Sequence, residues 1–407
     1  MTGRSGRVRR LAAAVLVTLA CQWAPVRAVT GPPAPAGRPP GQVVTWAASA
    51  DRLGEGAAGR SYRLIVHTSV AGSDLRVRLS NAFGDRPLTL DGVRAGLRRT
   101  GAALVPGSDR PLTFRGSRAV TVPTGAAVWS DPLPGHVPAG ADLAVSLHTP
   151  DAAGPATGHA LAMQTSYVGQ GDHTAETSGA GWTRPTGSWW YLDAVSVRPA
   201  DPATRAVVVL GDSLTDGWQS TPGRDRRWPD YLARRLHAAP TAVRGVANEG
   251  MSGDKVLGDD AGTGAVHRLQ RDVLSQPGAR TLLLFEGVND LKAHTGVTAA
   301  DLIAGYRAIV RRAHAAGLCV VGATIGPFEG WSEWDPAAEA VRQEVNRFIR
   351  TGGAFDAVVD FDRVLRGPHE PTRLRSAFDN GDHLHLDDAG MRALAGAVDP
   401  RTLDCAR

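Results

Sequence analysis

The sequence predicts two folded domains: an α/β domain with a three-layer, doubly wound parallel sheet, preceded by an all-β sandwich or jelly-roll domain. The first observation is length, because 407 residues exceed what one domain usually needs. The second is that residues 43–198 consist of short runs rich in Val, Leu, Thr, Tyr and Trp, separated by Gly, Pro, Asp and Asn, which is typical of antiparallel β-structure. The third is that strands and helices alternate after Pro202, which favours a parallel sheet covered on both faces.

Residues 1–28 have the features of a signal peptide. Arginines precede the apolar run LAAAVLVTLAC, and Val26-Arg27-Ala28 follows as a small-x-small cleavage pattern. The run is much shorter than the roughly 20 residues that a membrane span requires, and no later segment approaches that length. In a lipoprotein Cys21 would be lipidated, but Thr18 stands three positions before it, where an apolar residue is usual. We therefore expect a secreted protein.

The formal charge of +5 does not indicate a nucleic-acid partner. Five arginines and no acidic residue lie in residues 1–28. Once that segment is removed, 40 basic and 40 acidic residues remain, so the mature chain has a formal charge of zero. A neutral chain gives no reason to expect binding to nucleic acid or to an anionic membrane. We expect a monomer.

Residues 29–42 are rich in Pro and Gly and predict an extended leader. Residues 43–200 are expected to form the β-domain. In LRVRLS, Leu75, Val77 and Leu79 alternate with Arg76 and Arg78, which predicts a half-buried strand with its arginines facing water. This strand is expected at 74–83, and the other clear strands are expected at 61–70, 117–123, 141–149 and 188–197.

Residues 203–407 are expected to form the α/β domain. The run AVVVL is apolar throughout, as expected of a central parallel strand that is buried on both faces. The predicted strands are 206–210, 242–248, 281–287, 318–326 and 356–361, and the predicted helices are 228–239, 264–275, 298–316, 336–350 and 387–397.

Polar clusters follow three of these strands. They are GDSLTDG after the first strand, NEGMSGDK after the second and EGVND after the third. Ligands of doubly wound sheets bind beyond the carboxyl ends of the strands, so these clusters mark the expected site. Each cluster alone also suits an ordinary turn, since Gly, Asp, Ser and Asn are common turn residues.

A fourth cluster, FDNGDHLHLDDAG, occupies residues 378–390. Its Asp and His residues could ligate a metal, but the spacing is not that of a calcium loop and no Cys accompanies them. The spacing Asp382-x-x-His385 instead allows a carboxylate to orient an imidazole, as a nucleophile–base–acid arrangement requires.

GDSLTDG, NEGMSG, GVND and DHLH, in this order, resemble the four sequence blocks of the SGNH-hydrolase (GDSL-type esterase/lipase) family. The resemblance covers about residues 203–400 and implies a flavodoxin-like fold and ester hydrolysis without cofactor or metal. It implies Ser213 as nucleophile, His385 as base and Asp382 as its acid, with Ser213, Gly253 and Asn289 as oxyanion-hole donors. Leu386 follows the histidine where the family usually has Pro. The β-rich region is similar to the amino-terminal domains of exported actinobacterial members.

The residues themselves are compatible with this chemistry. Neutral His385 can accept the Ser213 proton as the hydroxyl attacks an ester, and water then releases the acid from an acyl-enzyme. No G-x-S-x-G elbow is present, which argues against an α/β-hydrolase. Ser252 and Lys255 form an S-x-x-K pattern, but the chain has no K-T-G to complete a penicillin-recognising site.

The substrate is not determined by the sequence: lipid, aryl and carbohydrate O-acyl esters all require the same site, on a small molecule or a polymer. The residues expected to line the pocket are Trp218, Leu214, Leu291, Trp331 and Trp334. The alternative function is a polysaccharide-binding protein that docks through tryptophans of the β-domain, Trp182, Trp189 and Trp190, although aromatic runs in strands are more often core.

After signal cleavage two cysteines remain, Cys319 and Cys405. Cys319 begins a predicted strand, and the last helix should bring the tail with Cys405 to the same end of the sheet. A disulfide and two free thiols both remain open.

Overall fold

The computed structural model describes residues 37–151, 154–292 and 296–405, together with Thr2. The predicted signal peptide, Thr2 apart, and residues 29–36 of the leader lie outside the described residues. Pro33–Arg407 forms one compact unit. Within the described part of the chain, no helix combines the length and apolarity needed to cross a bilayer.

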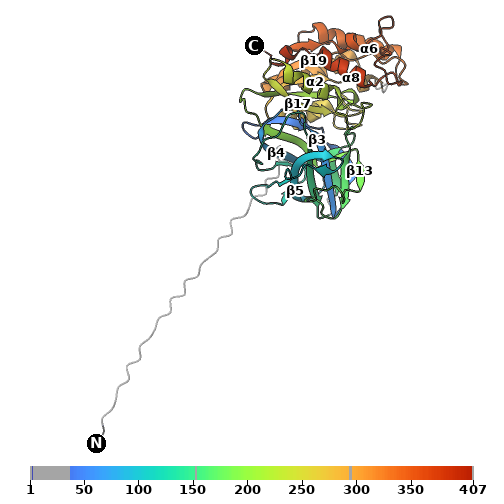
Figure 1. Ribbon diagram of the computed structural model, residues 1–407. Coiled ribbons are helices and arrows are strands. Elements are labelled where there is room, and N and C mark those ends of the chain that lie inside the picture. Colours follow the sequence, from blue (N-terminus) through green and yellow to red (C-terminus); the bar gives the residue numbers. More distant parts are fainter. Residues whose placement is uncertain (1, 3–36, 152–153, 293–295, 406–407) are drawn as a thin grey trace. The chain divides into compact units, whose positions relative to one another are not determined.

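The amino-terminal half is β-rich and its paired strands are antiparallel, as predicted (Figure 1). One sheet has the order β1-β15-β4-β9: Val43–Ala47, Leu192–Arg198, Ser73–Ser80 and Ala127–Trp129. The largest sheet has the order β13-β12-β3-β10-β5-β6: Arg184–Thr186, Ser166–Gln170, Arg60–His67, Asp142–Thr149, Leu88–Thr100 and Ala103–Leu104. In it β7 (Arg110–Pro111) and β8 (Val120–Val122) also pair with β5. A third sheet has the order β14-β11-β2: Trp189–Trp190, Pro155–His159 and Asp51–Glu55.

Arg78 in strand β4 corrects the prediction that both arginines of LRVRLS face water. Leu75, Val77 and Leu79 are buried as expected, but Arg78 is buried too. Its guanidinium lies 2.7 Å from the Asp193 carboxylate on β15 and 2.7 Å from the Ser275 hydroxyl of the α/β half. The second face of the strand is thus covered by another part of the chain, and a buried charge requires such partners.

The tryptophans considered as polysaccharide contacts are mostly core residues. Trp189 is 1% exposed, and its indole N–H donates to the Ile65 carbonyl at 2.8 Å. Trp182 is buried beneath the Arg63 guanidinium, which lies 4.3 Å from its ring centre. Trp190 is half-buried and stacks on Tyr62. Two of the three rings are therefore inaccessible to a polysaccharide, which corrects that hypothesis at the residue level.

The carboxyl-terminal half is the predicted parallel sheet, with the order β17-β16-β18-β19-β20. Strand β16, the first strand of this half in sequence, lies between β17 and β18, and the strand order reverses beside it, as in flavodoxin-like sheets. Ligands are therefore expected between β16 and β18. The bounds are Val243–Gly250, Arg205–Gly211, Ala279–Phe285, Cys319–Ala323 and Ala357–Val359.

Helices pack in two groups against this sheet. The first group is α2 (Trp228–Ala238), α7 (Phe361–Leu365) and α8 (Asp388–Ala397). The second is α3 (Ala265–Arg268), α5 (Ala299–Ala315) and α6 (Pro336–Thr351). The short helices α1 (Ser213–Asp216) and α4 (Val288–Lys292) follow β16 and β18, and a 3₁₀ turn (Pro400–Leu403) closes the chain. The helix predicted over 264–275 changes at Leu269–Leu274 into a π-helix.

The β-rich and α/β halves share one hydrophobic core along β1 and β17. The Val44 N–H donates to the Pro277 carbonyl at 2.9 Å. A Cβ atom on Gly245 would lie 2.5 Å from the Val44 carbonyl oxygen, so β1 approaches β17 as closely as a glycine allows. The end of the predicted leader also binds here, because the Arg38 Nε donates to the Leu274 carbonyl at 2.7 Å.

Cys319 and Cys405 form a disulfide with a Cα–Cα distance of 6.0 Å, which decides between the two alternatives left open by the sequence. Helix α8 crosses from the predicted site to the opposite end of the sheet, and the final turn brings Cys405 to the start of β19. The Thr281 hydroxyl also holds this tail by donating to the Leu403 carbonyl.

Candidate active site

Ser213 lies directly beyond the central strand β16, at the first residue of helix α1. The Asp212 carboxylate caps this helix by accepting from the Leu214 N–H at 2.9 Å, and Gly217, with a φ of 96°, ends it. Gly211 has no room for a side chain, since a Cβ would lie 2.3 Å from the Phe285 carbonyl oxygen. The turn is therefore tightly packed, and it presents the Ser213 hydroxyl at the carboxyl end of the sheet.

His385 meets Ser213 from a loop that lies 172 positions downstream. The Ser213 Oγ is 3.0 Å from His385 Nε2, and His385 Nδ1 is 2.7 Å from Asp382 Oδ2. Both Ser213 and His385 are buried, whereas Asp382 is half-buried. The structure thus brings the three predicted residues into one hydrogen-bonded line.

The His385 loop is held by short-range pairing. Asp379 and Leu386 form an isolated antiparallel bridge, and the Asn380 N–H donates to the His385 carbonyl at 3.2 Å. Leu386, which replaces the usual Pro, is fully buried in the core. Burial and pairing thus fix the loop without a proline.

The acidic residues of this loop have partners within the protein. Asp379 binds His383 Nδ1 at 2.7 Å, and Asp387 caps α8 by accepting from the Gly390 N–H. Asp388 accepts from the Thr221 hydroxyl and from Arg226. Burial opposes ionisation of Asp382, but hydrogen bonds from the backbone and ring of His385 outweigh it and lower the pKa of Asp382.

The predicted oxyanion donors come from the two neighbouring loops. Gly253 has a φ of 84°, in the left-handed region that favours glycine. Among the described residues, the backbone N–H groups of Ser213 and Gly253 have no protein acceptor. Asn289 is 1% exposed, and its amide donates one hydrogen to the Asp254 carbonyl at 2.6 Å. An amide nitrogen carries two hydrogens, so one remains for an oxyanion.

A buried arginine, Arg268, binds residues next to the predicted oxyanion donors. Arg268 is 1% exposed, and its Nε lies 2.6 Å from Asp254 Oδ2. The same guanidinium donates to the carbonyls of Gly211 and Glu249, each next to a predicted site loop. Burial raises the pKa of Asp254 to about 6, although the Arg268 charge opposes that shift.

The residues predicted to contact substrate differ in exposure. Trp331 is half-buried, and its ring meets the His385 ring edge-on at 5.7 Å. Trp218 and Trp334 are also half-buried. Leu214 and Leu291 are 3% and 5% exposed and belong to the core, so they shape the site from behind. Leu291 also borders a cavity of about 240 Å³ whose other lining residues include Asp290, Val297, Asp335, Ala338 and Val341.

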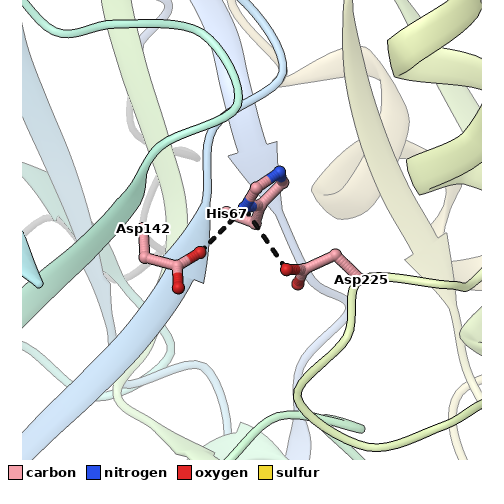
Figure 2. Close-up of side chains that lie close together, drawn as sticks. All are labelled: His67, Asp142 and Asp225. Carbon is pink, nitrogen blue, oxygen red and sulfur yellow. Dashed lines mark hydrogen bonds and ion pairs between the residues drawn. The ribbon is translucent and has the colours of Figure 1, made fainter. Parts of the chain in front are cut away.

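A separate charged cluster joins β3 and β10 to the loop before α2. Figure 2 shows the carboxylates of Asp142 and Asp225 directed at one ring nitrogen of His67, at 2.8 Å and 3.4 Å from Nδ1. The spacing is compatible with a metal ion. However, Arg98 already binds the second oxygen of Asp142 at 3.1 Å, so with a protonated His67 two positive groups balance two carboxylates. We interpret the cluster as an ion-pair network.

Asp216 and His159 lie beside the site but were not singled out from the sequence. The Asp216 Oδ1 lies 2.9 Å from Nε2 of His159, which ends strand β11 in the β-rich half. The only signal for Asp216 is its place in GDSLTDG. Nothing in the sequence around His159 indicates this contact, because 57 positions and a change of fold class separate the two residues.

Comparisons with known proteins give one family and several solved structures. Residues 209–393 match the family described as GDSL-like lipase/acylhydrolase. No curated protein matches the chain significantly. The M. smegmatis aryl esterase is 20% identical, with a TM-score of 0.39, over 48% of this chain and 96% of its own. A carbohydrate acetylesterase from Sinorhizobium meliloti is 19% identical (TM-score 0.38, 48% and 96%), and a GDSL-like lipase from Bacteroides thetaiotaomicron is 16% identical (TM-score 0.39, 49% and 87%).

Proposed function

We propose that the chain is a carboxylic ester hydrolase, an exported serine esterase that works through an acyl-enzyme, because residues 209–393 match the family described as GDSL-like lipase/acylhydrolase. The observation that carries this proposal is the line from Ser213 Oγ through the His385 ring to Asp382, with contacts of 3.0 Å and 2.7 Å. Nucleophile, base and orienting acid are therefore in hydrogen-bond contact.

In the first step, the Ser213 Oγ attacks the ester carbonyl carbon while His385 Nε2 takes the hydroxyl proton. Asp382 keeps Nδ1 protonated and stabilises the imidazolium that forms. His385 then gives its proton to the oxygen of the departing alcohol. The acyl group remains on Ser213 as an ester.

In the second step, His385 takes a proton from water, which attacks the acyl-enzyme. The proton returns to Ser213 as the carboxylic acid leaves. Negative charge develops on the former carbonyl oxygen in both steps. The N–H groups of Ser213 and Gly253 and the amide of Asn289 are the proposed donors, and each is worth roughly 10²–10³ in rate.

Export is supported by the signal-peptide features of residues 1–28. The disulfide between Cys319 and Cys405 is a second, independent support. Disulfides persist in oxidising compartments and are rare in the cytosol. Detection of the mature chain in culture medium, with its amino terminus at Val29, tests this part of the proposal.

The substrate class proposed is an O-acyl ester of an aryl, lipid or carbohydrate alcohol. Trp331 is half-buried and lies beside His385, so it is the proposed contact for the alcohol or acyl group of a bound ester. The solved structures named above include an aryl esterase and a carbohydrate acetylesterase, which guides the choice of probes. Acetyl, butyryl and long-chain p-nitrophenyl esters, together with acetylated xylan, distinguish these classes by kcat/KM.

The decisive test of the mechanism is covalent labelling. A fluorophosphonate should attach to Ser213, and Ser213→Ala should lose both labelling and about 10⁶-fold in kcat while it remains folded. The control is Ser178→Ala, an exposed serine of the β-rich half, which should be labelled and active. Labelling at Ser252 would reject the assignment and favour the S-x-x-K alternative.

A further inference from the structure

The Asp216 carboxylate connects the serine turn to the next loop of the site. Asp216 is 2% exposed and ends α1, the short helix that Ser213 begins. Its Oδ2 accepts from the Ser252 backbone N–H at 3.1 Å and from the Ser252 hydroxyl at 2.6 Å. Ser252 precedes Gly253, a proposed oxyanion donor. One buried carboxylate therefore fixes the distance between the loops that supply two of the donors.

The other oxygen of this carboxylate is bound by the β-rich half. His159 Nε2 lies 2.9 Å from Asp216 Oδ1, and His159 Nδ1 lies 2.8 Å from the Ser49 carbonyl oxygen. His159 is 6% exposed, and its ring packs 5.5 Å from that of Trp189. Both ring nitrogens face oxygen acceptors, so a ring that carries both protons satisfies both.

The electrostatics agree with this geometry. Burial lowers the pKa of His159, but the Asp216 charge and the hydrogen bonds to Asp216 and Ser49 outweigh burial and raise it. A charged imidazole opposite a carboxylate makes a hydrogen bond roughly twice as strong as a neutral one. Arg227 is the cation whose charge opposes the shift.

We propose that His159 is a positioning residue for ester hydrolysis. Through Asp216 and Ser252 it holds the Gly253 N–H at the place where it can converge with the Ser213 N–H on one oxyanion. The β-rich half thus contributes to the active site, although none of its described residues is among the groups proposed to act on the ester. This inference rests on the proposed serine-esterase function.

The physical reason is the sensitivity of an oxyanion hole to geometry. Donors act when they lie about 2.7–3.1 Å from the developing charge, and they stabilise the transition state more than the bound ester. A small shift of the Gly253 loop therefore lowers kcat and leaves KM nearly constant. If His159 only joined the two halves of the chain, its loss would lower the free energy of unfolding and would leave kcat unchanged.

Two isosteric replacements separate the two contacts of the ring. In His159→Gln the amide nitrogen replaces Nε2 and keeps a donor for Asp216. In His159→Asn the amide nitrogen replaces Nδ1, which keeps the contact with Ser49 and loses the one with Asp216. We expect kcat to fall about tenfold or more in the Asn variant, with KM within about threefold, and to stay within about threefold in the Gln variant.

Asp216→Asn provides a second route if a His159 variant does not fold. The amide carries no charge to pair with the protonated His159 ring, and its single oxygen replaces only one of the two carboxylate oxygens, so the contact with His159 is weakened and kcat should fall as in the His159→Asn variant. The double variant His159→Asn, Asp216→Asn should lose little more than Asp216→Asn alone, because both changes break one chain of contacts. Additive losses would contradict the proposal.

Ser213→Ala, assayed alongside, separates the two proposals. Hydrolysis that survives in Ser213→Ala rejects the serine-esterase function itself. If Ser213→Ala is inactive while the Asn and Gln variants have equal kcat, the esterase function stands and the role of His159 is rejected. Urea unfolding of each variant shows whether the loss of kcat parallels a loss of folding stability. If it does, the positioning role of His159 is also rejected.

Discussion

The carboxylate of Asp382 binds His385 at two points. Its Oδ2 lies 2.7 Å from the ring Nδ1, and its Oδ1 accepts from the backbone N–H of the same histidine at 2.8 Å. A single acidic residue therefore fixes both the path of the loop and the orientation of the ring, with Nε2 directed at Ser213.

Asp382→Asn should lower kcat by about 10³–10⁴ and move the acidic limb of the pH–rate profile to lower pH. The Asp382 carboxylate lies 2.7 Å from Nδ1 and stabilises the protonated ring, so its removal should move the limb to lower pH. The lowered pKa of Asp382 keeps its carboxylate charged in the native enzyme across that limb. Initial rates on a soluble ester between pH 5 and 8 measure the shift, and a limb that stays in place would contradict the pairing.

Asp379→Asn is the matched control for that experiment. Asp379 lies in the same loop and pairs with His383 in the way that Asp382 pairs with His385, at 2.7 Å from Nδ1. Its partner does not contact the serine. The limb should therefore stay at the wild-type pH.

The cluster shown in Figure 2 should make folding stability depend on pH. Burial lowers the pKa of His67, but Asp142 and Asp225 outweigh it, so the pKa is raised in the folded state. Stability from a raised pKa is fully present below the unfolded value of about 6.5 and is lost as pH rises through the folded value.

His67→Gln should remove that contribution, so wild type and variant should differ most at low pH and converge as the pH rises. Urea unfolding at several pH values between 5 and 9 measures the difference in the free energy of unfolding between the two proteins. Because both proteins contain His159, its contribution cancels in this difference. A difference in the free energy of unfolding that increases with pH would contradict this prediction. Stabilisation of the wild type by a divalent cation, absent in the variant, would instead favour a metal site.

Arg268→Met should destabilise the protein by about 3–5 kcal/mol, because it leaves the buried carboxylate of Asp254 without its partner. Chemical denaturation measures the loss. The control is Arg401→Met: Arg401 pairs with Asp399 at the surface, and its loss should not change the midpoint measurably. Equal effects would show that burial does not control the energetics of these pairs.

Reduction of the disulfide should destabilise the chain by about 2–4 kcal/mol, since the bond closes a loop with a sequence separation of 86 residues. Unfolding in the presence and absence of a thiol reductant measures this. A Cys319→Ser, Cys405→Ser variant should match the reduced wild type and ignore the reductant. Two free thiols in the denatured, unreduced protein would refute the bridge.

The sequence predicted the five strands and the longer helices of the α/β half because each has a local signal, but it missed several strands of the β-rich half, among them β5 (Leu88–Thr100). The run AVVVL has the pattern expected of a strand buried on both faces, and the block around Ser213 follows it directly. Arg78 was placed wrongly because alternation reports which residues share a face and not what covers that face. The contact of His159 with Asp216 was missed for the same reason: it depends on how two halves of the chain pack, which no local pattern contains.

The close approach of β1 to β17 bears on how this chain can be taken apart. A carbonyl oxygen of one half occupies the space above Gly245 of the other, and the apolar side chains along this contact belong to one core. A calorimeter should therefore record one cooperative melting transition. Grafting the catalytic half onto another scaffold would expose to water the face of β17 that β1 covers here. An engineer who wants this active site should therefore transplant both halves together.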